Sequence, residues 1–381
     1  MSGQFAELLD SAHQQTCPAV VAIPAKNEAD RIGVCLTALS DQQHHPDAVI
    51  LLLNKCNKCT DGTEATARAL APRLGFEPDL ACLDLTPAQA NAGCARRLAM
   101  QLAAKRAGPG GVLLTTDADT VVPPDWVTRN LAALDAGADV VCGRVEVDPA
   151  EAALIPAHLH ADDALECRLI ALLDDIAWLL DSEPHDPPPR HTEASGASLA
   201  VTAAAFQRVG GIPAIPSTED RTFVTALWRM DARIRHDPAI RVSVSGRTVG
   251  RAPGGMADAI RRRMVRQDKF TDDQVEPAAA ALLRYGLRSA ARNIWRLQRI
   301  DALLADDLGI PVRVLAKALR RPFFGAAWAA LEPASPHLGR RRVRFTELPK
   351  EIARAEAIVR QLLPTEARAW RTAPAEALAA D

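Results

Sequence analysis

Short apolar runs alternate with longer amphipathic segments through the first half of this chain. Continuous apolar runs are typical of strands that helices cover on both faces, and they occur at residues 19–23, 49–53, 111–115 and 139–142. Patterns with helical periodicity lie between these runs, at residues 29–40, 63–73, 88–107 and 125–136. The alternation predicts an α/β fold with a mostly parallel, Rossmann-like sheet. Ligands of such sheets bind outside the carboxyl ends of the strands.

The pattern changes after residue 150. Residues 158–182 predict one amphipathic helix, and the proline-rich run 182–190 must be a loop because proline ends helices. A second loop at 210–217 leads to a helix at 220–231 and then to a last strand at 242–245. The two loops carry the most individual part of the sequence, which is where binding specificity is usually found.

Length and charge bound the picture further. The 381 residues are enough for one large α/β domain with an appendage. Helical, arginine-rich patterns follow the Gly254-Gly255 pair, so we expect one domain at 1–255 and a helical C-terminal region at 256–381. Because 45 basic and 47 acidic residues give a net charge of −2, no overall charge favours binding to nucleic acid.

The cysteines and the start of the chain indicate a compartment. Eight cysteines are scattered without a disulfide-like pattern, and residues 1–16 lack the apolar segment of an export signal. We therefore expect a soluble, cytoplasmic protein with reduced thiols. Cys56 and Cys59 could form half of a zinc site or a redox pair, but no second pair follows at ligand spacing.

The most informative polar residues are Asp117 and Asp119, which come directly after the apolar run at 111–115. A divalent cation such as Mg²⁺ binds oxygen ligands, commonly one or two carboxylates together with substrate phosphates. The pair is therefore a candidate metal site. The same residues would also suit an ordinary solvent-exposed strand end, so the pair alone does not decide between the two.

Two other enzyme classes have motifs that resemble parts of this sequence. The Asp-x-Asp pair after an apolar run also resembles the opening of the haloacid-dehalogenase phosphatases, in which the first aspartate accepts a phosphoryl group. Those enzymes need a later lysine and a further acidic pair at a strand end. Here the next lysine is Lys269, and Asp174-Asp175 falls inside a predicted helix. Ser198 loosely matches a nucleophile elbow but lacks the buried strand before it, which excludes that reading.

Five blocks in a fixed order resemble the family 2 glycosyltransferases. They are VVAIPAKNE at 20–28, LLLN with CTDGT at 51–54 and 59–63, AGCARR at 92–97, DAD at 117–119, and SGA, FQRVGG and TED at 195–197, 206–211 and 218–220. No block is specific alone, but their order makes coincidence implausible. Two departures stand out: Asn54 replaces the aspartate that usually recognises the base, and the signature of processive synthases is missing.

The resemblance implies a GT-A fold and a non-processive glycosyltransferase of the hexosyltransferase type. It would move a sugar from a nucleotide-diphosphate donor to an acceptor hydroxyl with Mg²⁺ or Mn²⁺ as cofactor. By resemblance Asp119 would hold the metal, and Asp117 would contact the metal or the ribose. The implied nucleotide contacts are Pro24, Ala25, Asn27, Glu28, Asn54, Arg96, Asp117 and Arg251, of which Arg251 would close over the diphosphate.

For the acceptor, the resemblance implies that Asp220 is the general base of an inverting transfer and that Glu219 orients it. Without the FQRVGG block at 206–211, which precedes them, the two acids would be interpreted as ordinary residues of a helix N-terminus, where the helix dipole favours acidic side chains. The acceptor would be a small molecule or a lipid-linked one. Besides the phosphatase, a non-catalytic GT-A relative that only binds a nucleotide stays open as an alternative.

The segment 312–328 is basic and amphipathic. It could rest on an anionic membrane surface to reach a lipid acceptor. Such a face more often packs on its own domain or on a second copy in a homodimer, which is the interpretation we prefer.

Overall fold

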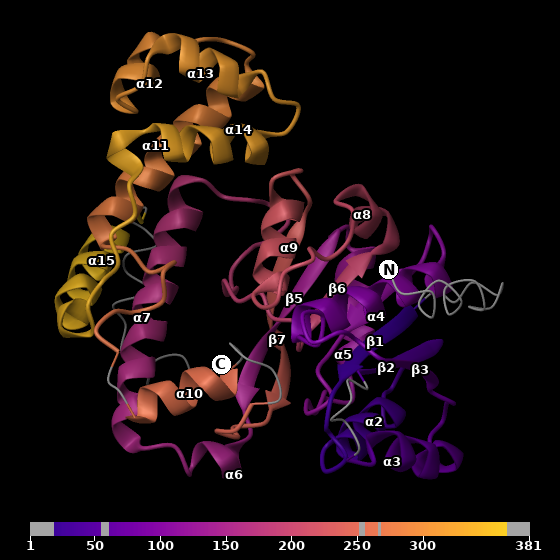
Figure 1. Ribbon diagram of the computed structural model, residues 1–381. Helices are drawn as coiled ribbons and strands as arrows, with labels where there is room; N and C mark the ends of the chain where they lie inside the picture. Colours follow the sequence, from indigo (N-terminus) through magenta and orange to yellow (C-terminus); the bar gives the residue numbers. More distant parts are fainter. Residues whose placement is uncertain (1–18, 55–60, 251–255, 266–267, 364–381) are drawn as a thin grey trace, which may run out of the picture. The chain divides into compact units, whose positions relative to one another are not determined.

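The computed structural model describes residues 19–54, 61–250, 256–265 and 268–363 (Figure 1). The chain divides into two compact units. The first comprises residues 1–155 and 185–265, and the second comprises 156–184 and 266–381. The long helix that follows residue 155 therefore belongs to the second unit, whereas the sequence analysis grouped it with residues 1–255.

The first unit is built on one sheet of seven strands. The strands are β1 (Ala19–Ala25), β2 (Ala48–Asn54), β3 (Asp79–Leu83), β4 (Val112–Thr115), β5 (Val140–Val147), β6 (Leu199–Thr202) and β7 (Ile234–Val244). Their order across the sheet is β3-β2-β1-β4-β6-β5-β7. Every neighbouring pair is parallel except those that β6 makes with β4 and β5. The predicted mostly parallel α/β sheet is confirmed.

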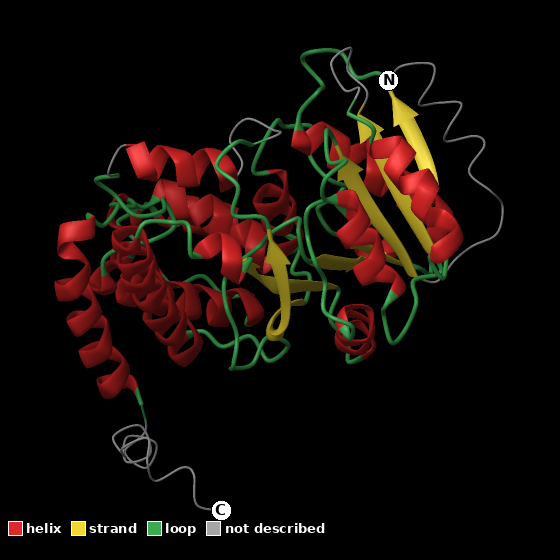
Figure 2. Ribbon diagram, turned by 90° about the horizontal axis from the view of Figure 1, so that it is seen from below, coloured by secondary structure: helices red, strands yellow, loops and turns green. Residues whose placement is uncertain are grey.

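Helices cover both faces of this sheet (Figure 2). The helices of the first unit are α2 (Ile32–Ser40), α3 (Thr63–Leu70), η1 (Ala71–Arg73), α4 (Ala92–Ala107), α5 (Trp126–Asp135), α6 (Pro149–Ala152), α8 (Ala203–Arg208), α9 (Glu219–Trp228) and α10 (Met256–Val265). Residues of α4, α8 and α9 pack on one face and residues of α2, α3 and α5 on the other. Two-sided burial explains why the strand sequences are continuous apolar runs.

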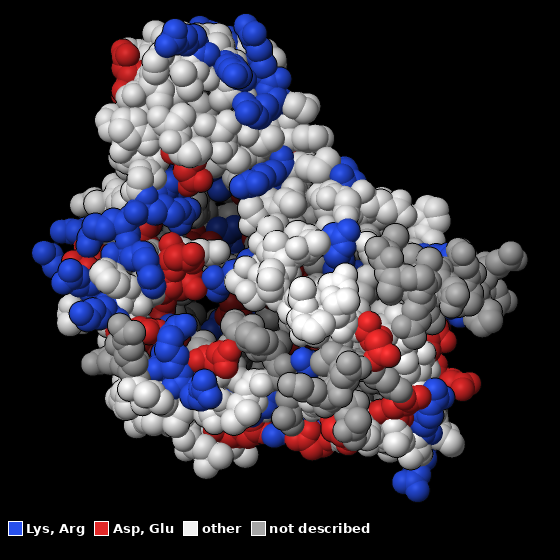
Figure 3. Space-filling view, viewed as in Figure 1, with Lys and Arg blue, Asp and Glu red and all other residues white. Residues whose placement is uncertain are grey.

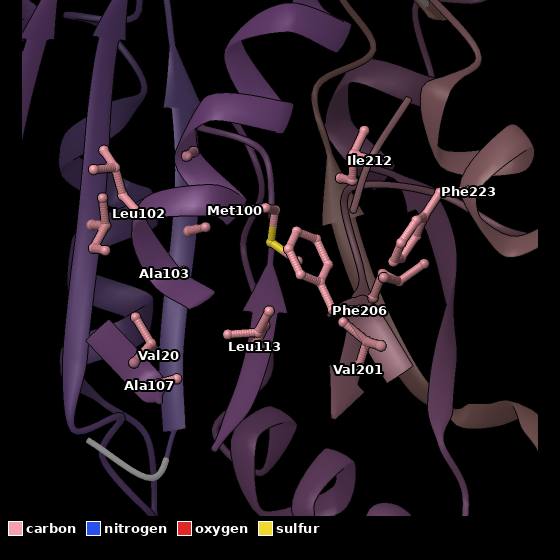
Figure 4. Packing of buried hydrophobic residues seen from close by; sticks show 14 of the residues in the cluster. Val20, Met100, Leu102, Ala103, Ala107, Leu113, Val201, Phe206, Ile212 and Phe223 are labelled. Carbon is pink, nitrogen blue, oxygen red and sulfur yellow. The ribbon is translucent and has the colours of Figure 1, made fainter. Parts of the chain in front are cut away.

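The strand β1 shows how the core is divided. Val20 and Ala22 point into one cluster of buried side chains, and Val21 and Ile23 point into the other, because successive side chains of a strand face opposite ways. In the first cluster, Met100 of α4 lies beside the ring of Phe206 of α8 (Figure 4). Each such large side chain contributes about 1.5–3 kcal/mol when it is buried.

One predicted helix start was wrong. The helix α4 begins after Asn91, whose side chain accepts a hydrogen bond from the Cys94 backbone N–H, instead of at residue 88. Thr86 and Pro87 open a turn, in which the Thr86 carbonyl accepts from Gln89 and Ala90. The side chain of Asn91 therefore caps the N-terminus of the helix, whereas Thr86 and Pro87 lie in the turn before it.

The second unit is helical. It contains α7 (Ala157–Leu180), α11 (Ala278–Arg296), α12 (Ala302–Asp307), α13 (Val312–Leu319), α14 (Phe324–Leu331), η2 (Glu332–Ala334), η3 (Pro336–Leu338), η4 (Phe345–Glu347) and α15 (Leu348–Leu362). Helices α7, α11 and α15 pack against one another around one apolar cluster. Leu315 and Leu319 of the basic amphipathic segment are buried, so its apolar face packs within its own unit.

Basic side chains gather on the outside of the helix α13, which carries Arg313 and Lys317 (Figure 3). Among the described residues, no helix has both the length and the apolar character that crossing a membrane would require.

Candidate active site

Polar side chains meet where neighbouring parallel strands of the first unit end. The strand β1 lies between β2 and β4, and all three run in the same direction. Glu28 follows β1, Asn54 ends β2, and Asp117 and Asp119 follow β4. Because parallel strands end at the same edge, these residues, far apart in sequence, belong to one edge of the sheet, where α/β proteins bind ligands.

Arg96 of α4 connects this edge of the sheet to Gly196 and Glu219, which belong to the SGA and TED motifs. Its side chain is buried, with 5% of its surface exposed. Its guanidinium donates to Glu219 Oε1 at 2.9 Å and to Thr115 Oγ1 at 2.9 Å, and it pairs with Asp117 Oδ1 at 2.5 Å. Burial alone would lower the pKa of Arg96, but Asp117 and Glu219 raise it, so the guanidinium stays charged.

Gly196 places Asp220 on the same network. The Gly196 carbonyl accepts a hydrogen bond from Arg96 at 2.9 Å, and its N–H donates to Asp220 Oδ2 at 2.9 Å. A Cβ atom at position 196 would lie 2.2 Å from the guanidinium carbon of Arg96, so any larger residue there would have to displace the guanidinium. The second oxygen of Asp220 accepts from the Arg221 N–H at 2.7 Å. Both oxygens of this carboxylate are thus oriented by the backbone.

A second arginine, which the sequence analysis did not single out, bridges the ends of β1 and β4. The Arg247 guanidinium donates to both oxygens of Glu28 at 2.7 Å and lies 3.0 Å from Asp119 Oδ2. The arginine that we expected in this role, Arg251, lies outside the described residues. A signal was present, because Arg247 is the first arginine of the same glycine-containing loop after the last strand.

The Asp119 carboxylate is in an unusually negative environment. Burial and the neighbouring Asp117 raise the pKa of Asp119 to about 7, and Glu28 adds to the effect, while Arg247 opposes it. An aspartate that is hard to ionise in the free protein is a position at which a bound cation would relieve repulsion.

The residues expected to line the base and the ribose lie at the ends of β1 and β2. Asn54 is 2% exposed, and its Oδ1 has no hydrogen-bond partner among the described residues. The buried Oδ1 of Asn27 also lacks one, and Asn27 has a positive φ of 56°. Pro24 is partly buried, whereas the Ala25 side chain packs in the core, so Ala25 can offer a ligand only its backbone. Buried acceptors without partners point to a ligand that donates hydrogen bonds.

The residues present fit a divalent cation held by two carboxylates and by oxygens of a bound diphosphate. Within the described part of the chain, this edge joins five carboxylates to two guanidiniums, those of Arg96 and Arg247. No group of three or more His, Cys, Asp or Glu residues with metal-ligand geometry occurs in that part. Asp119 and Asp117 stay the candidate protein ligands that the motif predicts.

His236 does not supply a further ligand. Its Nδ1 lies 2.9 Å from Asp186 Oδ2, and its backbone N–H donates to Asp186 Oδ1 at 2.8 Å. Burial would lower the pKa of His236, but Cys142 and Asp186 raise it to about 10. The pair fastens the proline-rich loop to β7. The Cys56 and Cys59 positions lie outside the described residues.

Comparisons with known proteins agree with the sequence motifs. The family model described as glycosyl transferase family 2 matches residues 20–182. No curated protein matches the chain.

Solved structures are similar at low identity. S. aureus TarS in complex with UDP-GlcNAc is 15% identical, over 82% of this chain and 90% of that chain, with a TM-score of 0.44. A mannosyltransferase from Pyrobaculum calidifontis in complex with GDP-Man and Mn²⁺ is 17% identical, over 97% and 89%, with a TM-score of 0.42. Glucosyl-3-phosphoglycerate synthase from Mycobacterium tuberculosis, in complex with Mn²⁺, UDP and glucosyl-3-phosphoglycerate, is 18% identical. The match covers 63% of this chain and 74% of that chain, with a TM-score of 0.37. These scores are too low to carry an argument.

Proposed function

We propose, from the match of residues 20–182 to the model of glycosyl transferase family 2, that the chain is a metal-dependent, inverting glycosyltransferase. The donor is a nucleotide-diphosphate sugar, and the acceptor is an alcohol. The observation that carries the proposal is the hydrogen-bond network through Arg96 and Gly196. It joins Asp117 of the DAD motif to Asp220 of the TED motif.

Asp220 is the proposed general base. An acceptor hydroxyl does not ionise near neutral pH, so a carboxylate within hydrogen-bond reach must take its proton as the new bond forms. Asp220 is partly exposed, and the backbone N–H groups of Gly196 and Arg221 fix its direction. It can therefore meet an acceptor from solvent without losing its orientation.

Glu219 has a positioning role in this scheme. Its side chain is buried and its Oε1 accepts from Arg96, so it is poorly placed to exchange a proton with a substrate. Holding Arg96 in turn holds Asp117 and the Gly196 carbonyl. The expected pair of catalytic acids thus divides into a base, Asp220, and a support, Glu219.

Asp119 and Asp117 would hold Mg²⁺ or Mn²⁺. When bound there, the cation supplies Lewis-acid stabilisation of the negative charge on the leaving diphosphate. Asn54 and Asn27 carry buried, unpaired acceptor oxygens that suit N–H groups of a base or hydroxyls of a ribose. A side-chain amide also donates, so Asn54 suits a base edge that pairs an N–H with a carbonyl.

The remaining partner assignments are part of the same proposal. The acceptor is a small molecule or a lipid-linked alcohol, and the protein works in the cytoplasm. A homodimer and a peripheral membrane contact through the basic C-terminal helices are predictions. For the membrane contact, the turn after α11 offers exposed Leu297 (65%) and Ile300 (51%) beside exposed Arg296 and Arg299.

The test is release of nucleoside diphosphate from a panel of nucleotide sugars in the presence of Mn²⁺ or Mg²⁺. Turnover should disappear with EDTA and in Asp119→Asn, but persist in the control Asp125→Asn, whose carboxylate pairs with Arg129 at the surface. Asp220→Asn should still bind nucleotide but lose transfer to an acceptor. Release of phosphate from small phosphoesters without nucleotide-sugar turnover would instead establish the phosphatase. Nucleotide binding without turnover, with acceptors present, would establish a binding protein.

A further inference from the structure

Arg247 bridges two carboxylates that end different strands. It donates to both oxygens of Glu28 at 2.7 Å and lies 3.0 Å from Asp119 Oδ2. The Glu28 and Asp119 side chains are 6% and 15% exposed, and that of Arg247 is 21% exposed. One guanidinium therefore bridges two largely buried carboxylates and offsets only part of their negative charge, and one of the two is the proposed principal ligand of the metal.

The loop that carries Arg247 is held in place by Glu151 of α6. Glu151 Oε2 accepts from the Gly246 N–H at 2.6 Å and from Ser245 Oγ at 2.9 Å. A Cβ on Gly246 would lie 2.7 Å from a methyl carbon of Val147, so the backbone passes close to β5. The loop is anchored just before Arg247, and the long side chain of the arginine reaches from this anchor to the site.

A divalent cation and a guanidinium cannot share the Asp119 carboxylate without strong repulsion. Two like charges that share one carboxylate repel each other strongly in partly buried surroundings, and the double charge of a divalent cation doubles the repulsion. Binding of the cation must therefore move the Arg247 guanidinium away from Asp119. Glu28 remains as one partner, and the diphosphate of the donor offers new anionic oxygens that an arginine binds well.

We propose that Arg247 is an internal counter-cation, which occupies the Asp119 carboxylate in the free protein and transfers to the donor diphosphate when metal and donor bind together. This inference rests on the proposed function, because it needs a metal site at Asp119. It makes the arginine a positioning residue that couples metal binding to donor binding: the cation alone competes with Arg247, whereas the cation with the donor gives the guanidinium another anionic partner.

The test measures Mn²⁺ binding without turnover, from the electron paramagnetic resonance signal of free Mn²⁺. Without nucleotide, Arg247→Gln should bind Mn²⁺ at least about tenfold more tightly than the wild type, because the competing charge is gone. The matched control is Arg241→Gln on β7, which removes an exposed arginine paired with Glu146 and should bind like the wild type. With a nucleoside diphosphate present, Arg247→Gln should lose most of its advantage over the wild type.

Unchanged or weaker Mn²⁺ binding by Arg247→Gln would overturn the proposal and leave Arg247 as a structural ion pair. If that variant does not fold, Arg247→Lys decides: a lysine cannot hold Glu28 bidentately while contacting Asp119, so Mn²⁺ should bind about threefold or more tightly. Failure of the proposed function is seen separately, as absence of nucleotide release by the wild type or of Mn²⁺ binding that Asp119→Asn removes.

Discussion

Replacement of Arg96 by methionine is the sharpest test of the network at the strand ends. Methionine keeps the length and the apolar stem of the side chain but removes the guanidinium, which contacts Asp117, Glu219, Thr115 and the Gly196 carbonyl. The Glu219 side chain is only 6% exposed. In the variant this carboxylate would stay buried without its cation, so we expect a large loss of stability.

The magnitude follows from that burial. Breaking a buried ion pair by removing one partner costs about 3–5 kcal/mol, because the remaining charge is left uncompensated. For a domain of the size of the first unit, 1 kcal/mol lowers the Tm by about 2–4 °C, so Arg96→Met should lower it by roughly 6–20 °C. Arg97→Met is the matched control, since Arg97 is half-buried and donates to the Ile212 carbonyl. It should cost no more than about 1 kcal/mol.

The assay is thermal unfolding followed by circular dichroism, with both single variants and the double variant Arg96→Met/Glu219→Leu. Removing both charges should recover most of the loss, because apolar side chains can replace a buried pair. A Tm within about 2 °C of the wild type for Arg96→Met, or a double variant no more stable than the single one, would show that the buried pair does not hold the strand ends together.

Three further outcomes are expected. Gly196→Ala should lower donor turnover about tenfold or more, because the new Cβ displaces the Arg96 guanidinium, whereas Gly110→Ala, which meets open space, should not. Arg284→Met in the second unit should lower the free energy of unfolding by about 3–5 kcal/mol in the same assay, because it leaves the buried carboxylate of Glu276 without its cation. His236 has a pKa raised to about 10, so its pairing stabilises the fold fully below about pH 6.5 and is lost as the pH rises toward 10. The Tm difference between wild type and His236→Gln should therefore be largest near pH 6 and shrink by pH 10.

The strands that the sequence predicted are those that the sheet buries on both faces. Residues 19–23 and 49–53 became β1 and β2 because their apolar character is continuous. The strands β3 and β6 were not predicted. The first is a five-residue strand at the sheet edge that is only partly buried, and the second has only four residues and pairs antiparallel with both its neighbours. Short strands form because partners are already in place, which no local pattern reports.

The site divides in the same way. The DAD and TED motifs identified Asp117, Glu219 and Asp220 as candidate site residues, and all three lie around Arg96 in the structure. Arg247 was missed because the sequence alone does not show which arginine of the glycine-containing loop after the last strand reaches the site. Its position depends on the loop at 245–247 folding onto Glu151, about a hundred residues earlier, which is tertiary structure and not local sequence.

The charge balance of the site argues for an order of binding. Five carboxylates and two guanidiniums meet among the described residues at this edge, and the donor diphosphate would add further negative charge. An uncompensated buried excess of one charge is costly, and a bound cation offsets part of it. A donor arriving alone would worsen the imbalance, while a divalent cation arriving alone must displace Arg247 from Asp119. The cation and the diphosphate should consequently bind as one complex, so that each offsets the cost that the other meets.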